Sequence, residues 1–138
     1  MLKNIIRLIL FFLIKIIPKN KKILVFGDRG GIRFADNSRY LFFYLNKNHK
    51  EFKCVWITKS PKILNLLRNL DYEIYLSNSI KGIYYCLIAK WHLFNFIEDD
   101  IHKIITTFSN SILLWHGVLP KKLNSIHHKS NIVNNFIY

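Results

Sequence analysis

The sequence predicts an α/β protein with a parallel, Rossmann-like sheet preceded by an amphipathic N-terminal helix. Short apolar runs of strand length alternate with segments of helical periodicity along most of the chain. Glycine and polar residues follow several of these runs, as they do at the carboxyl ends of strands in parallel sheets. This alternation favours right-handed crossovers that place helices on the faces of one sheet.

The chain of 138 residues carries 21 Lys+Arg against 8 Asp+Glu, a formal net charge of +13. Such a length leaves room for one domain, and the charge predicts attraction to an anionic lipid, polyphosphate polymer or nucleic acid. Zinc-finger spacings, RNP-type motifs and arginine-rich helices do not occur in the sequence, so we expect no nucleic acid as a partner. Cys54 and Cys86 lie in apolar segments and predict buried thiols.

Residues 1–17 form the first predicted helix. Its apolar run from Ile5 to Ile17 is shorter than the roughly 20 residues that span a bilayer, and Lys15 interrupts the apolar core that a signal peptide needs. Lys3 and Arg7 continue a cationic stripe along the helix. We expect a helix that lies in the interface of an anionic membrane. Packing against the domain, or a signal anchor, remains an alternative.

After Pro18 a short basic linker leads into a buried strand at Ile23–Phe26, followed directly by the turn Gly27–Gly31. Backbone N–H groups in a glycine-rich turn can approach an anion, so Gly30 and Gly31 are candidates for such contacts. The turn does not match the G-x-G-x-x-G fingerprint. An ordinary turn without a ligand is the alternative.

Asp36, Asn37 and Ser38 are good N-cap residues ahead of a predicted helix over 39–46. Further along the chain the pattern predicts strands at 52–58, 72–76 and 92–97, and helices at 60–70 and 79–90. The acidic cluster of residues 98–100 can bind a metal, but a solvated turn is favoured and no metal site is predicted. A loop over 106–110 and a strand at 112–115 complete the pattern.

This last strand ends at His116-Gly117, with Lys121 and Lys122 shortly after. An imidazole beside a flexible glycine and two cations suits a reaction that deprotonates a hydroxyl near a phosphate. The alternative is a strand-end histidine bonded to a backbone carbonyl, with lysines that face water.

Trp115-His116-Gly117, with Leu119 and the two lysines at their spacing, resembles the WHGT-x-LKK signature of the CDP-glycerol glycerophosphotransferases, which build teichoic-acid-type polymers. Residues 36–42 (DNSRYLF) and 55–57 (VWI) resemble two further motifs of that family, in the same order. The resemblance covers approximately residues 21–123. Val118 stands where the family usually has Thr.

The resemblance implies the N-terminal, acceptor-side lobe of a two-lobed GT-B-like fold. We expect an interfacial helix at 1–18, the lobe at 19–123, and a mobile tail or the start of a linker at 124–138. Because the donor-binding lobe does not fit in this length, we expect an incomplete enzyme. No cofactor is expected.

By the same resemblance, the reaction transfers glycerol phosphate, or a related polyol phosphate, from CDP-glycerol to a lipid-linked acceptor in teichoic-acid or capsule-type polymer synthesis. His116 would be the general base. The substrate-binding residues would be Gly117, Lys121, Lys122, Asp36, Asn37, Gly30 and Gly31.

The expected location is peripheral, on the cytoplasmic face of the cell membrane. Two other functions stay open: a non-catalytic module that binds the membrane surface, and a capsule glycosyltransferase of the same architecture.

Overall fold

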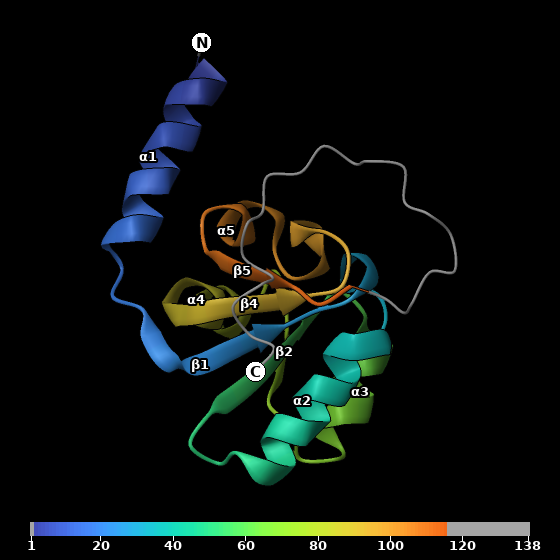
Figure 1. Ribbon diagram of the computed structural model, residues 1–138. Coiled ribbons are helices and arrows are strands. Elements are labelled where there is room, and N and C mark those ends of the chain that lie inside the picture. Colours follow the sequence, from blue (N-terminus) through green and yellow to red (C-terminus); the bar gives the residue numbers. More distant parts are fainter. Residues whose placement is uncertain (1, 116–138) are drawn as a thin grey trace, which may run out of the picture.

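The computed structural model describes residues 2–115 of the chain, which form one five-stranded, all-parallel sheet covered by helices (Figure 1). The strands are β1 (Asn20–Phe26), β2 (Lys53–Thr58), β3 (Ile74–Leu76), β4 (Ala89–Phe94) and β5 (Asn110–Leu113). The α-helices are α1 (Leu2–Ile16), α2 (Asp36–Asn48), α3 (Pro61–Arg68), α4 (Ile80–Ile88) and α5 (Lys103–Thr107). Two 3₁₀ turns, η1 (Arg29–Gly31) and η2 (Glu98–Asp100), follow β1 and β4.

The strand order is β3-β2-β1-β4-β5. Strands β2 and β3 therefore lie on one side of β1, and β4 and β5 lie on its other side. The carboxyl ends of β1 and β4 form the topological switch point, where open α/β sheets bind their ligands. The predicted fold class and parallel sheet are confirmed.

The last strand, predicted at 112–115, is β5 at Asn110–Leu113, and two further predictions were wrong in detail. The fourth strand begins at Ala89 and ends at Phe94, earlier than the predicted 92–97, because α4 stops at Ile88 and the chain becomes extended at once. Residues 103–107 form α5, which the prediction of a loop over 106–110 missed. This helix is only five residues long, and His102 caps it through its ring nitrogen, so its sequence carries little helical periodicity.

The two faces of the sheet hold different cores. Even-numbered residues of β1 face α2 and α3, where Phe26, Phe42 and Trp56 form a contiguous aromatic cluster with ring centroids 5.4–6.4 Å apart. Odd-numbered residues of β1 face α4 and α5 in a mainly aliphatic core that includes Val25 and Ile105. Figure 1 shows these helix pairs on opposite sides of the sheet. Cys54 and Cys86 are free and buried, as predicted.

His92 ties the aliphatic face together from the middle of β4. Its side chain is fully buried, and its ring nitrogens lie 2.9 Å from Cys86 O and 2.9 Å from Thr106 Oγ1. Because a carbonyl only accepts, Nε2 donates to Cys86 and Nδ1 accepts from the Thr106 hydroxyl. Burial lowers the pKa of His92 to about 4. The neutral ring therefore links β4 to α4 and α5 with both nitrogens satisfied.

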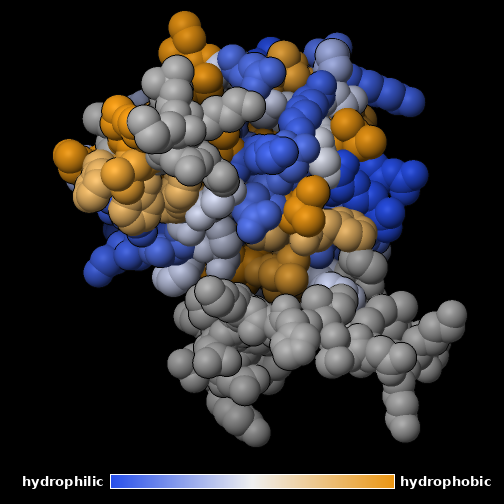
Figure 2. Space-filling model, turned by 90° about the horizontal axis from the view of Figure 1, so that it is seen from above, coloured by the Kyte–Doolittle hydropathy of each residue, from blue (hydrophilic) through white to orange (hydrophobic). Residues whose placement is uncertain are grey.

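The helix α1 stands at the edge of the fold and contacts it through one face. Ile14 is buried, and the ring of Phe11 meets that of Phe108 edge-on at 5.6 Å. A second stripe is about half exposed or more, and comprises Ile5, Leu8, Ile9, Phe12 and Ile16. In Figure 2, orange apolar side chains gather at the left, where α1 stands in Figure 1. Within residues 2–115, no helix has the length and apolar character needed to cross a membrane.

Candidate active site

The loops after β1 and β4 touch at the switch point. Gly27 donates its N–H to Leu93 O at 3.2 Å, and a Cβ at this glycine would lie 2.2 Å from Asp100 O. Only glycine allows this approach without displacing the backbone of η2. The first residue after β1 therefore brings the ends of the two strands together.

Asp28, the next residue, is the end of a buried polar chain that runs from β1 through β4 to α2. Its Oδ1 accepts a hydrogen bond from Asn95 Nδ2 at 2.9 Å. Asn95 Oδ1 in turn accepts from both Ser38 Oγ at 2.9 Å and Ser38 N at 3.2 Å. All three residues are fully buried. Asn95, at the end of β4, thus satisfies an N–H group in the first turn of α2.

The second carboxylate oxygen of Asp28, Oδ2, is buried and has no hydrogen-bond partner among the described residues. Burial raises the pKa of the Asp28 carboxyl, and the bond from Asn95 opposes this rise. Asp36 and Asp100 raise the pKa further through their charges, while Arg29 lowers it. A buried oxygen without a partner is costly, so this end of the chain of hydrogen bonds is a strained part of the site.

The solvated turn predicted for the acidic cluster after β4 is found at Glu98 and Asp99, but Asp100 is fully buried. Its Oδ1 accepts from Gly30 N at 2.7 Å and its Oδ2 from Phe96 N at 2.9 Å. Gly31 donates its N–H to Asp28 O at 2.9 Å. The anion contact predicted for Gly30 and Gly31 stays a prediction, and these bonds argue against a contact made through their N–H groups.

Both glycines have left-handed backbone conformations, with φ of 65° at Gly30 and 77° at Gly31. Their neighbour Arg29 is also left-handed at 43° and stacks its guanidinium 4.7 Å from the ring centroid of Phe96. Within residues 2–115, no three His, Cys, Asp or Glu side chains lie close enough together to hold a metal ion. Asp100 instead shapes the loop that follows β1.

The predicted N-cap role of residues 36–38 was wrong. The N-cap of α2 is Ala35, which makes no side-chain cap. Asp36 is left-handed with φ 52° and pairs with Arg29 Nη2 at 3.2 Å. The side chain of Ser38 points to Asn95, as described above. The three polar side chains connect α2 to other loops and do not cap their own helix.

Asn37 makes the link that matters most for the predicted catalytic motif. Its amide Nδ2 donates to Leu114 O at 3.1 Å and to Trp115 O at 2.7 Å, directly after β5. Trp115 is left-handed, with φ 61°. The structure thus joins two segments that the sequence keeps almost eighty residues apart, the start of α2 and the residue that precedes His116.

His116, Gly117, Lys121 and Lys122 lie outside the described residues. The predicted base, and three of the predicted substrate contacts, therefore remain predictions. Asp36 and Asn37 lie at the carboxyl edge of the sheet, and Gly30 and Gly31 lie in the loop after β1 at the same edge. Their predicted contacts with substrate also stay predictions.

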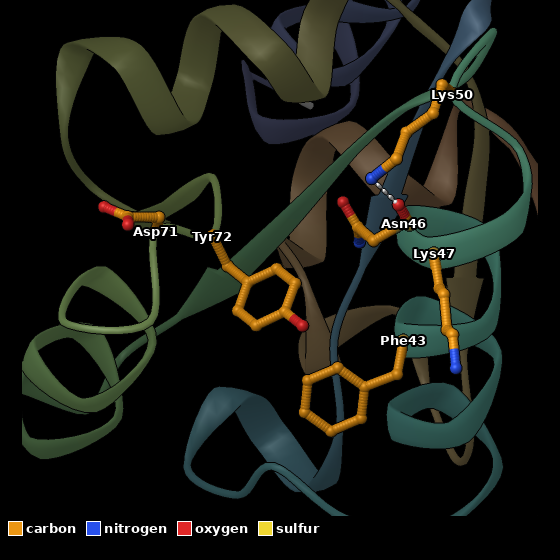
Figure 3. A pocket seen from close by; sticks show the side chains of 6 residues that line it. All are labelled: Phe43, Asn46, Lys47, Lys50, Asp71 and Tyr72. Atoms are coloured by element: carbon orange, nitrogen blue, oxygen red, sulfur yellow. Dashed lines mark hydrogen bonds between the residues drawn. The ribbon is translucent and has the colours of Figure 1, made fainter.

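A separate cavity of about 600 Å³ lies at the opposite edge of the sheet (Figure 3). The C-terminal half of α2 and the turn before β3 line it with Phe43, Asn46, Lys47, Lys50, Asp71 and Tyr72. Phe43 and Tyr72 face each other at 5.3 Å between ring centroids, and Lys50 Nζ bonds to Asn46 O. None of the predicted site residues lines this cavity, so we place the site at the carboxyl edge.

Sequence reasoning did not single out Asn95 or the role of Asp28. A signal for both exists, because each is a polar residue placed at the end of a buried strand. Asn95 stands between Phe94 and Phe96, where an amide has few reasons to occur unless it is fully bonded. The prediction that this strand continued to residue 97 concealed the signal.

The sequence is similar to proteins of one family. The family model described as CDP-Glycerol:Poly(glycerophosphate) glycerophosphotransferase matches residues 9–135. A teichoic acid poly(glycerol phosphate) polymerase from Bacillus spizizenii is 31% identical over 120 residues. That match covers 83% of this chain but only 29% of the relative, so the chain spans less than a third of the polymerase's length.

Two solved structures of variants of the wall teichoic acid polymerase TagF share the fold. One, from a CDPG soak, superimposes with a TM-score of 0.56 at 18% identity over 84% of this chain and 30% of the TagF chain. The other gives a TM-score of 0.57 at 19% identity over 96% of this chain and 33% of the TagF chain. At this level of identity the likeness establishes the fold alone.

Proposed function

The chain belongs to the CDP-glycerol:poly(glycerophosphate) glycerophosphotransferase family, and from this we propose that it forms the acceptor-side lobe of an enzyme that transfers glycerol phosphate from CDP-glycerol to a membrane-linked acceptor. The observation that supports this most directly is the bond from Asn37 to the backbone of Trp115. It holds the start of the His-Gly motif at the carboxyl edge of a parallel sheet, beside the switch point.

In the proposed reaction, a hydroxyl oxygen of the acceptor attacks the phosphorus that carries glycerol. The bond from that phosphorus to the oxygen of CMP breaks, and CMP leaves. His116 accepts the hydroxyl proton, since imidazole titrates near neutral pH. Lys121 and Lys122 balance the phosphate charge, and Gly117 lets the backbone approach the reacting group. The product is a polymer one glycerol phosphate longer.

The test is the release of CMP from CDP-glycerol in the presence of a lipid-linked poly(glycerol phosphate) acceptor. We expect His116→Ala to abolish acceptor-dependent release, whereas His49→Ala, a half-buried histidine outside the site, leaves it unchanged. Because the chain spans only part of its relatives, the same variants are also assayed with residues 9–135 replacing the matching segment of the Bacillus polymerase. Equal turnover in His116→Ala and the unaltered protein would remove His116 as the base.

The exposed stripe of α1 favours a second, complementary activity, which is binding to the membrane that carries the acceptor. Ile5, Leu8, Ile9, Phe12 and Ile16 recur at the spacing of one helical face, while Ile14 packs on the domain. A net charge of +13 adds attraction to anionic lipid. We place the protein on the cytoplasmic face of the membrane, with α1 in the interface.

Sedimentation with anionic vesicles tests this placement. Leu8→Asp with Phe12→Asp should release the protein from the vesicles, because two carboxylates enter the apolar stripe. The matched control is Leu66→Asp with Leu70→Asp, two equally exposed leucines at α3 and its end. If both double variants sediment like the unaltered protein, the stripe does not bind membrane.

A further inference from the structure

We infer that Asn37 is a positioning residue, which fixes the backbone entering the His-Gly motif and does not itself bind substrate. This inference deepens the proposed function and rests on it. It reassigns a residue that the sequence placed among the substrate contacts.

The side-chain amide of Asn37 already uses both of its hydrogens. A side-chain NH₂ group has two hydrogens, and in Asn37 these meet two successive carbonyl oxygens, Leu114 O at 3.1 Å and Trp115 O at 2.7 Å. The donors that would contact a phosphate or hydroxyl of the substrate are therefore already engaged. Donation from Asn37 to the substrate would require this pair of bonds to break.

The bonds of Asn37 hold an unusual backbone conformation directly after β5. Leu114 N still bonds to Phe94 O of β4 at 2.8 Å, so the sheet ladder continues to this residue. At Trp115 the backbone then turns to φ 61°, a left-handed conformation that costs a bulky residue about 1–2 kcal/mol. Carbonyls that point to one shared donor compensate for part of this cost. Asn37 thus fixes the backbone at Trp115, the residue before His116 in the sequence.

Buried hydrogen bonds fix the start of α2 next to Asn37. The next residue, Ser38, is fixed through both its N–H and its hydroxyl by Asn95, which is held in turn by Asp28. One helix start therefore connects the carboxyl ends of β1, β4 and β5. Of the four left-handed residues other than glycine in residues 2–115, Arg29, Asp36 and Trp115 belong to this region. Strain that gathers in one place is typical of functional sites.

A positioning role of Asn37 can be tested separately from folding. The two bonds of Asn37 are exposed to solvent, where such bonds contribute about 1 kcal/mol or less to stability. Asn37 also lies in the first turn of α2, where a negative charge is favourable. The variant Asn37→Asp should therefore fold normally, although its carboxylate repels both carbonyl oxygens.

The experiment compares Asn37→Asp with Asn48→Asp in the full chain. The control makes the same chemical change in the same helix, where Asn48 Nδ2 bonds locally to Tyr44 O at 3.0 Å. In NMR spectra, the carbonyl ¹³C resonances of Leu114 and Trp115 should move upfield in Asn37→Asp and stay in place in Asn48→Asp. Unmoved resonances in Asn37→Asp would overturn the inference.

CMP release provides the second readout. We expect Asn37→Asp to lower kcat by about 10²-fold with KM nearly unchanged, since a small misplacement of a reacting group has this cost. A raised KM with normal kcat would show Asn37 to be a substrate ligand and overturn the inference. If neither the unaltered protein nor the Bacillus polymerase that carries residues 9–135 releases CMP, the result counts against the proposed function. The NMR result then tests the positioning role of Asn37 by itself.

Discussion

Two fully buried polar clusters lie close together along β4, and they differ in how they end. The cluster around His92 is closed, because both ring nitrogens are bonded and the partners belong to α4 and α5. The cluster around Asn95 is open, because it ends at Asp28 Oδ2, which has no partner among the described residues. A closed cluster is explained by the fold it supports. The open one has a cost that the fold does not explain.

The two clusters also differ in location. His92 lies in the middle of β4, beneath the helices of the aliphatic face. Asn95 lies just beyond the end of β4, at the switch point and beside the start of α2. The difference teaches that burial of polar groups alone does not mark a functional site. Incomplete bonding at the carboxyl edge of a parallel sheet is the more specific sign.

The largest effect is expected from opening the second cluster completely. Asn95→Leu keeps a similarly branched side chain but removes the partner of Asp28 Oδ1, of the Ser38 N–H and of the Ser38 hydroxyl. We expect the free energy of unfolding to fall by about 3–5 kcal/mol in a urea titration. Asn65→Leu, on the exposed side of α3, should change it by less than about 0.5 kcal/mol. If the two variants have similar free energies of unfolding, the buried hydrogen bonds of Asn95 do not stabilise the fold.

The closed cluster around His92 should make the free energy of unfolding depend on pH. The folded protein holds His92 neutral with a pKa of about 4, whereas the unfolded chain protonates it below about 6.5. Protons are thus taken up on unfolding between these values, and stability rises with pH across this window. We expect His92 to account for a loss of roughly 3 kcal/mol as the pH falls from about 6.5 to about 4.

His92→Leu should remove this contribution, at the cost of lower stability at neutral pH. The measurement is a set of urea titrations between pH 4 and 7 on both proteins. An equal slope in the two proteins would contradict the assignment to His92.

The sheet and its helices could largely be predicted from the sequence, because buried parallel strands are short apolar runs and the helices between them have a visible period. The capping residue Ser60 and the helix after Pro61 are examples, since Ser60 Oγ accepts from Ile63 N and the helix begins at the proline. The helix α5 was not predicted, because its five residues are too few to show a helical period.

The site could be predicted only in part, because its bonds join residues that are far apart in sequence. Asn37 was predicted as an N-cap residue and, by the family resemblance, as a substrate contact. Its partners at Leu114 and Trp115 depend on the order of β1, β4 and β5, which no local pattern encodes. Asp100 was taken for a surface residue for the same reason, since its partner Gly30 is seventy residues away.

A smaller effect, of opposite sign, is expected at Asp28. Asp28→Asn keeps the shape and removes the charge from a buried site, so it should raise the free energy of unfolding by about 1 kcal/mol at neutral pH. Because burial raises the pKa of this carboxyl above 3.8, the folded protein binds the proton more tightly and loses stability as the pH rises. The advantage of Asp28→Asn should therefore disappear at acidic pH.

Urea titrations of Asp28→Asn at pH 4 and pH 7 test this. If the variant is less stable than the unaltered protein at both pH values, the carboxylate is needed for folding and the cluster is not strained.

The smallest effect is expected from a polar pair at the same edge that belongs to neither cluster. Arg29 and Asp36 bond at 3.2 Å, but their side chains are 40% and 32% exposed, so water and salt screen the pair. Asp36 has φ 52°, a conformation that asparagine tolerates well, so Asp36→Asn changes the charge without adding backbone strain. We expect a loss below about 1 kcal/mol that vanishes in high salt.

Asp71→Asn is the matched control, because Asp71 is likewise left-handed, with φ 58°, and lies in the turn before β3. A loss at Asp36 that is as large as that at Asn95 and persists in salt would show that this ion pair belongs to the buried cluster. Arg29 would then belong to the strained site, and the loop after β1 would help to position α2.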